Sequence, residues 1–224
     1  MSDEIDAPPV LCAIGDRYAI VRLNRPAEFN RLTATMLGEL EKAFRSLGDI
    51  ERLTAVIVTG TGGLFSAGAD LKEVATLIPP TALEFSHRGQ SLMAMLDDPR
   101  KISIAAIDGH CLGGGLDLAL GCDLRYATAR ASFQHPGAHR GIITGWGGTV
   151  RLPRTVGPDA ARRIFVTGEK IDAAEALRIG LVNEICDDAL ARAREVAEQI
   201  VAEWTPEKIA ALKASFAAAQ QQAM

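Results

Sequence analysis

The 224-residue chain contains no apolar run near the ~18 residues that a membrane-spanning helix requires. Its first six residues, Met-Ser-Asp-Glu-Ile-Asp, are acidic and lack the apolar core of a signal peptide. Its four cysteines form no Cys-x-x-Cys pair and have mostly apolar neighbours, so we expect reduced thiols. The net charge of −4 argues against a nucleic-acid-binding protein. We therefore expect a cytoplasmic protein that binds neither a membrane nor nucleic acid.

Several motifs of known chemistry are also missing. There is no Gly-Lys-Ser/Thr of a P-loop, and Phe65 stands where a dinucleotide-binding loop requires its third glycine. Ser66 lacks the first glycine of a nucleophile elbow. No His-Glu-x-x-His occurs, and the Pro136-Gly137 pair between His135 and His139 argues against a helical metal site. We expect no metal.

What the chain does contain is an ordinary globular composition, with 48% hydrophobic and 23% charged residues. Its length indicates one domain, or one domain plus a small appendage. Runs typical of strands alternate with runs typical of helices, which predicts an α/β fold. Residues 10–24 are predicted to form two short strands with a turn at Gly15-Asp16, and further strands are predicted at 54–59, 102–107, 124–128 and 181–185. The predicted helices are 33–47, 81–97, 116–121, 158–166, 173–179 and 189–204.

Two of the predicted strands are followed by glycine-rich segments that lead into helices. These segments are Phe65 to Leu71 and Gly109 to Asp117. Backbone without side chains lets a ligand approach main-chain N–H groups, and a helix N-terminus adds free donors. Two such ends facing one point could hold an oxyanion between two amides. The glycines could equally serve only tight turns and close packing of helix on sheet, and the residues alone leave both interpretations open.

The order of these segments and their neighbours resembles the crotonase, or enoyl-CoA hydratase/isomerase, superfamily. The resemblance extends from about residue 10 to residue 186, and its specificity comes from the combination of motifs rather than from any one of them. The segments that carry it are Asn24-Arg25-Pro26, Phe65 to Leu71, Gly109 to Leu118, Cys122-Asp123, Gly147 to Leu152, Val166-Thr167-Gly168 and Ala173 to Val182.

The resemblance implies a crotonase-like α/β fold, in which a spiral core of ββα units over residues 1–156 precedes a helical C-terminal segment over 157–224. This second segment, used for trimerisation or as a cap, is shorter than is usual in the family. The family forms homotrimers, often paired into hexamers. Its substrate is an acyl-CoA thioester, so coenzyme A enters with the substrate and no tightly bound cofactor is expected. Lys208 and Lys213 are the basic residues left near the C-terminus to meet the CoA phosphates.

The resemblance also assigns site residues by position. The two backbone amides that stabilise a thioester enolate are those of Ala69 and Gly114. The path of coenzyme A is implied to follow Arg25, Ala27, Ser66, Ala67, Gly68, Ala69, Asp70, Leu71, Gly113 and Gly114.

The carboxylates depart from the family pattern. Family hydratases use two glutamates, and here the first position is Asp117 and the second is Gly137, which cannot transfer a proton. We expect Asp117 to move the proton, although an acid in the first turn of a helix is also stabilised by the helix dipole alone. His135 and His139, on the same loop as Gly137, are further candidates for acid–base catalysis. We expect Gly137 itself to need a positive φ.

The sequence therefore predicts an acyl-CoA enzyme of hydratase/isomerase type that stabilises a thioester enolate. Two alternatives stay open because of Gly137. One is an isomerase, decarboxylase or thioester hydrolase that uses a single carboxylate, and the other is a non-catalytic acyl-CoA-binding protein. We also expect the apolar stripe of the last predicted helix to pack on another subunit or on the core; its members are Leu190, Val196, Ile200, Val201 and Trp204.

Overall fold

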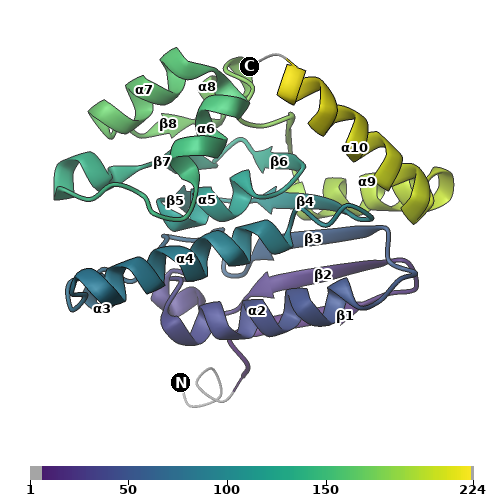
Figure 1. Cartoon of the computed structure of the whole chain (residues 1–224), viewed down its shortest axis with the longest axis horizontal. Helices are drawn as coiled ribbons and strands as arrows, with labels where there is room; N and C mark the ends of the chain where they lie inside the picture. Colours follow the sequence, from purple (N-terminus) through teal and green to yellow (C-terminus); the bar gives the residue numbers. More distant parts are fainter. Residues whose placement is uncertain (1–6, 223–224) are drawn as a thin grey trace.

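The computed structural model describes residues 7–222, so the acidic segment 1–6 lies outside the described residues. A six-stranded sheet runs through the middle of the molecule (Figure 1) in the order β1-β2-β3-β4-β6-β9. Its strands are β1 (Val10–Ile14), β2 (Tyr18–Leu23), β3 (Ala55–Gly60), β4 (Ile102–Ile107), β6 (Leu124–Thr128) and β9 (Glu184–Cys186). All neighbours are parallel except β1 and β2, which form an antiparallel hairpin.

A second, three-stranded sheet consists of β5 (His110–Leu112), β7 (Ser132–Gln134) and β8 (Ile171–Asp172). The helices that surround the two sheets are α2 (Ala34–Gly48), α3 (Leu71–Val74), α4 (Pro79–Met95), α5 (Gly114–Leu120), α6 (Gly148–Val156), α7 (Pro158–Thr167), α8 (Ala173–Arg178), α9 (Ala189–Glu203) and α10 (Pro206–Gln222), with 3-10 turns η1 (Pro26–Glu28) and η2 (Pro136–Arg140). The predicted α/β class is confirmed.

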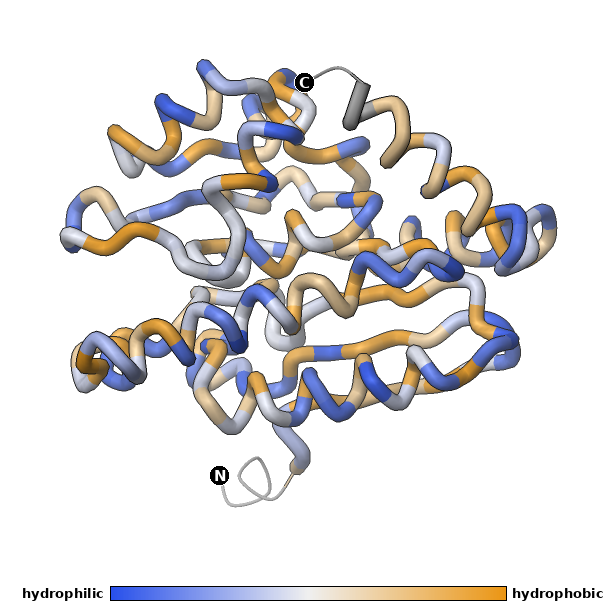
Figure 2. The backbone as a smooth tube through the Cα atoms, viewed as in Figure 1, coloured by the Kyte–Doolittle hydropathy of each residue, from blue (hydrophilic) through white to orange (hydrophobic). Residues whose placement is uncertain are grey.

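The central strands are buried on both faces, as the unbroken apolar run of 54–59 predicts. In β3, Val56 and Val58 pack into the core shared with α2, α4 and α5, whereas Ala55 and Ile57 pack into a second core beneath α9. Figure 2 shows the resulting hydrophobic colour along the middle strands. Because α2 and α4 cover one face (Figure 1) and α9 the other, the sheet provides a rigid base for the loops at its edge.

Most predicted elements are present within one to three residues of their expected bounds. Thr33 is the N-cap of α2 and accepts a hydrogen bond from the Met36 amide, as expected. The predicted strand 181–185 begins three residues too early, since β9 is Glu184–Cys186. Strands β5, β7 and β8 were not predicted, because two or three residues carry no periodic signal.

The apolar stripe of α9 packs on its own sheet. Val196 belongs to the second core, and Leu190 and Ile200 pack against it. For these three residues, the predicted alternative of packing on the core is therefore confirmed. Lys213, on α10, donates hydrogen bonds to the Asp98 carbonyl at 3.0 Å and to the Asp123 carboxylate at 2.8 Å. Its ammonium group thus anchors α10 to the core.

No helix within residues 7–222 is both long enough and apolar enough to cross a membrane.

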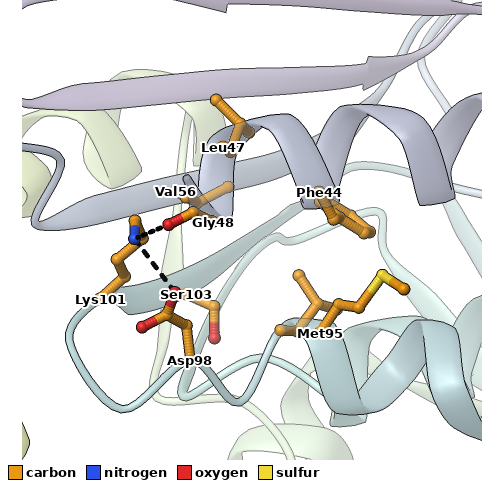
Figure 3. A pocket seen from close by; sticks show the side chains of 9 residues that line it. Phe44, Leu47, Gly48, Val56, Met95, Asp98, Lys101 and Ser103 are labelled. Carbon is orange, nitrogen blue, oxygen red and sulfur yellow. Dashed lines mark hydrogen bonds and ion pairs between the residues drawn. The ribbon is translucent and has the colours of Figure 1, made fainter. Parts of the chain in front are cut away.

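A small cavity of about 20 Å³ lies where the C-terminal end of α2 meets the loop before β4 (Figure 3). Lys101 is one of the residues that line this cavity, and it is only 3% exposed. The Lys101 ammonium donates to the Gly48 carbonyl at 3.1 Å and to the Asp98 carboxylate at 3.0 Å. A cation at this place also complements the negative end of the α2 dipole.

We expect Lys101→Met to lower the free energy of unfolding by about 2 kcal/mol, because the Gly48 carbonyl and the Asp98 carboxylate lose a buried donor. Urea denaturation followed by circular dichroism measures the change. Lys42→Met is the matched control, because the Lys42–Glu39 ion pair is exposed and should contribute less than about 0.5 kcal/mol. If both variants lost the same free energy of unfolding, the burial of Lys101 would contribute nothing to stability.

Candidate active site

The first glycine-rich segment is fixed between the η1 turn and strand β5. The Ser66 hydroxyl donates to the Asn30 carbonyl and accepts a hydrogen bond from the Gly68 amide. The Ala67 amide donates to the Phe29 carbonyl, and the Leu112 amide donates to the Ser66 carbonyl. Buried Ser66 therefore holds the following residues close to the start of α5.

The backbones of the two glycine-rich segments meet at Gly68 and Gly114. A Cβ built on Gly68, whose φ is +86°, would lie 2.8 Å from the Gly114 nitrogen. A Cβ built on Gly114 would lie 3.4 Å from the Ala69 nitrogen. Within residues 7–222, neither the Ala69 amide nor the Gly114 amide donates a hydrogen bond to another group. Two free N–H groups thus lie side by side, and this approach requires glycine at position 68.

Asp117 lies in the first turn of α5, with its side chain completely buried. The Thr144 hydroxyl donates a hydrogen bond to its Oδ2 atom. Its Oδ1 atom has no hydrogen-bond partner in the described part of the chain. Burial raises the pKa of Asp117 from 3.8 to about 7, against the opposing effects of the Thr144 hydrogen bond and the Arg151 charge. Near neutral pH this carboxyl group can therefore either give or take a proton.

His135 faces the free oxygen of Asp117. Its Nε2 atom lies 3.4 Å from Oδ1 and is itself buried without a hydrogen bond to any described residue. The imidazole packs against Phe165, with 4.8 Å between ring centroids. Burial lowers the pKa of His135 from 6.5 to about 4, so the ring is neutral at pH 7. The contact therefore joins a neutral imidazole to a carboxyl group and is not an ion pair.

The structure does not bring His139 to this pair. His139 is exposed on η2, and its ring lies against Gly168, where a built Cβ would be 2.8 Å from Nε2. Of the expected coenzyme A residues, Asp70 serves as the N-cap of α3 and pairs with Arg31 at 3.0 Å. Arg25 and Ala27 lie at and within η1, beside the Ser66 segment, and Leu71 is exposed.

The structural reason for a glycine at position 137 differs from the expected one. Its φ is not positive, so the expectation of a left-handed conformation is wrong. A Cβ built on Gly137 would instead lie 2.1 Å from the Ile142 carbonyl oxygen. The Ile142 amide also donates to the Gly137 carbonyl at 3.0 Å, which closes this turn. Backbone therefore occupies the space in which a side chain at this position would begin.

Sequence reasoning missed Thr144 and Trp146, which lie on the loop that covers Asp117. The indole of Trp146 is buried against Gly114. The sequence feature that could have pointed to this loop is its glycine pattern at 145, 147 and 148. Gly148 packs directly on Asp117. Among residues 7–222, no three His, Cys, Asp or Glu side chains form a group that could hold a metal ion.

Both the sequence and the fold of this chain are similar to those of known proteins. The profile of the enoyl-CoA hydratase/isomerase family matches residues 14–224. A crotonyl-CoA hydratase of Syntrophomonas wolfei is 38% identical over 189 residues, covering 83% of this chain and 73% of the relative. The structure of Pseudomonas aeruginosa DspI has a TM-score of 0.90 at 35% identity and covers 97% of this chain and 90% of its own. An enoyl-CoA hydratase of Thermoplasma volcanium has a TM-score of 0.90 at 30% identity, with 97% and 86% covered.

The two pKa shifts predict opposite effects of pH on stability. The folded-state pKa of Asp117 is raised, so its protonation stabilises the fold. This contribution to stability is complete below pH 3.8 and is lost as the pH rises through about 7. The folded-state pKa of His135 is lowered, so its contribution is present above pH 6.5 and is lost as the pH falls to about 4.

We expect Asp117→Asn to become more stable relative to wild type as the pH rises from 4.5 to 7.5. At about 1.4 kcal/mol per pKa unit, the change is on the order of a few kcal/mol. Urea denaturation at the two pH values measures it. His135→Gln is the control and should change in the opposite direction over this range. A pH-independent difference between Asp117→Asn and wild type would contradict the raised pKa.

Proposed function

The chain belongs to the enoyl-CoA hydratase/isomerase family, and from this premise we propose that it stabilises the enolate of an acyl-CoA thioester with two backbone amides and moves a proton with Asp117. The crotonase-like fold expected from the sequence is confirmed by the family match and by the shared architecture of the solved relatives. Coenzyme A enters as part of the substrate.

The observation that carries the proposal is the free amide pair of Ala69 and Gly114, located one helical turn from a buried carboxyl group. When a proton leaves the carbon next to a thioester, negative charge develops on the thioester oxygen. Two fixed N–H donors aimed at that oxygen stabilise the charge without reorganisation. This supports assigning the oxyanion site to Ala69 and Gly114.

Asp117 fits the role of proton carrier. Its ionised form takes a proton from the substrate and its neutral form returns one, and a pKa near 7 makes both forms available. His135 is the second member of the pair, because its neutral Nε2 can share the proton of the Asp117 carboxyl. The segment Ser66 to Leu71, with Gly113, Arg25 and Ala27, is proposed to line the path of coenzyme A.

The packing at Gly137 favours a reaction that needs one carboxylate. Isomerisation requires only that one group remove a proton and return it at another carbon. Hydration with a water held between two carboxylates has no second carboxylate at position 137, where the Ile142 backbone lies. A single-carboxylate isomerase is therefore the second candidate. The family's homotrimers or dimers of trimers, and a cytoplasmic location, stay predictions for this chain; a stable monomer in light scattering would contradict the assembly.

We expect Asp117→Asn to slow exchange of solvent deuterium into butyryl-CoA by about 10²–10⁴-fold, because the variant lacks its proton carrier. Mass spectrometry measures the exchange, and calorimetry should show unchanged coenzyme A binding. The wild-type rate should rise through pH 7, where Asp117 ionises. Asp159→Asn is the control, since its side chain is 93% exposed.

Equal exchange in wild type and Asp117→Asn would show that Asp117 is structural. If neither protein exchanges or converts crotonyl-, dienoyl- or malonyl-type thioesters while both bind them, the chain is a non-catalytic acyl-CoA-binding protein. The same panel of thioesters identifies the reaction.

We expect Gly137→Glu not to create hydratase activity. Its Cβ would meet the Ile142 carbonyl, so the turn must shift at a cost of about 1–3 kcal/mol. Loss of enoyl absorbance with crotonyl-CoA and urea denaturation measure the two effects. Gly48→Ala is the control, because no atom lies within 4 Å of its built Cβ. Faster hydration at undiminished stability would contradict the steric argument.

A further inference from the structure

The indole of Trp146 lies directly against one of the two free amides. A Cβ built on Gly114 would be 2.4 Å from Trp146 Cζ3, so the ring packs on the Gly114 backbone. The side chain is 2% exposed. Because the Gly114 amide is proposed to bind the thioester oxygen, this ring borders the place proposed for the first carbons of the acyl group.

Helix α4 holds the other edge of the indole. A Cβ built on Gly89 would be 2.0 Å from Trp146 Cδ1, so the ring is wedged between Gly89 and Gly114. Its Nε1 atom donates to the Phe85 carbonyl at 3.1 Å, and the Phe85 ring packs on it at 5.0 Å. The hydrogen bond and both glycine contacts fix the orientation of the ring.

The backbone around Trp146 is equally fixed. The Gly145 carbonyl accepts hydrogen bonds from the Ser86 hydroxyl and from the Gln90 side-chain Nε2, both at 2.8 Å. On the other side, Thr144 donates to Asp117. The indole therefore cannot turn away without breaking its hydrogen bond to Phe85 and its packing on Gly89 and Gly114.

We propose that Trp146 is a specificity-determining residue that bounds the acyl subsite and restricts the enzyme to short acyl groups. The inference rests on the proposed function, because that function places the thioester oxygen at Ala69 and Gly114. Proton transfer requires the α- or γ-carbon to lie near the Asp117 carboxyl group, on which Gly148 of the same loop packs. The chain beyond the reacting carbons then meets an indole that is packed on two helices.

The test compares the affinities of acetyl-, butyryl- and decanoyl-CoA by titration calorimetry. These saturated thioesters report binding independently of catalysis. In wild type, affinity should not increase from butyryl to decanoyl, because the added methylenes find no buried space. In Trp146→Ala each newly buried methylene tightens binding by about fourfold, so the decanoyl-to-butyryl preference should rise at least about tenfold.

A second variant changes the subsite in the opposite direction. Gly89→Ala places a methyl group against Cδ1 and moves the indole toward Gly114, so butyryl-CoA should lose affinity relative to acetyl-CoA. Gly48→Ala is the matched control on α2, with no atom within 4 Å of its built Cβ, and should keep the wild-type order. Trp146→Phe, a smaller ring in the same place, should give a preference between wild type and Trp146→Ala.

Chain-length preferences that are the same in wild type, Trp146→Ala and Gly89→Ala overturn the proposal. If Trp146→Ala does not fold, Gly89→Ala and Trp146→Phe decide the question by the same ratios. Failure of the proposed function has a different signature, because wild type would then exchange no solvent deuterium into butyryl-CoA or bind none of the three thioesters, whatever the ratios in the variants. Binding of all three with unchanged ratios in the variants removes only the role of Trp146.

Discussion

The Asp117 carboxyl group lies in the core at the first turn of α5, with one oxygen bonded to Thr144 and the other facing the His135 imidazole. Removing a carboxylate from water is costly, and one hydrogen bond and the nearby charge of Arg151 offset that cost only in part. The result is a carboxyl group that holds its proton up to about pH 7. The same burial keeps His135 neutral, so the pair carries one exchangeable proton instead of two opposite charges.

The loop from Gly141 to Gly148 makes this burial possible. It places the Thr144 hydroxyl and the Gly148 backbone on the carboxyl group, and it fills the adjacent space with the Trp146 indole. Its contacts to α4 run through the Gly145 carbonyl and the Trp146 ring nitrogen. One short segment therefore sets both the protonation of Asp117 and the space beside the Gly114 amide. A change in α4 that displaces this loop alters both properties together.

Local signals predicted much of this arrangement. Thr33 marks the start of α2, and the unbroken β-favouring run from Thr54 marks a doubly buried strand, because caps and apolar runs act over a few neighbouring residues. The glycine-rich segments pointed to the amide pair, and the family resemblance assigned it to Ala69 and Gly114. The long-range contacts of the loop over Asp117 were harder to predict. Thr144 lies 27 residues along the chain and Trp146 contacts a helix some 60 residues before it, and such contacts have no sequence period. His135 and His139 look alike in sequence, and only the turn at η2 makes one buried and the other exposed.

Gly137 shows how a missing side chain has a structural cause as well as a chemical effect. The Ile142 carbonyl and amide fold back on it, so the chain uses this space for a backbone turn. That turn begins the loop whose Thr144 hydroxyl and Gly148 backbone lie on Asp117. A side chain at position 137 and the present path of the loop are therefore mutually exclusive. The absence of a side chain at position 137 and the burial of Asp117 therefore both belong to one loop conformation, which holds a carboxyl group with a pKa near 7, as the proposed proton carrier requires.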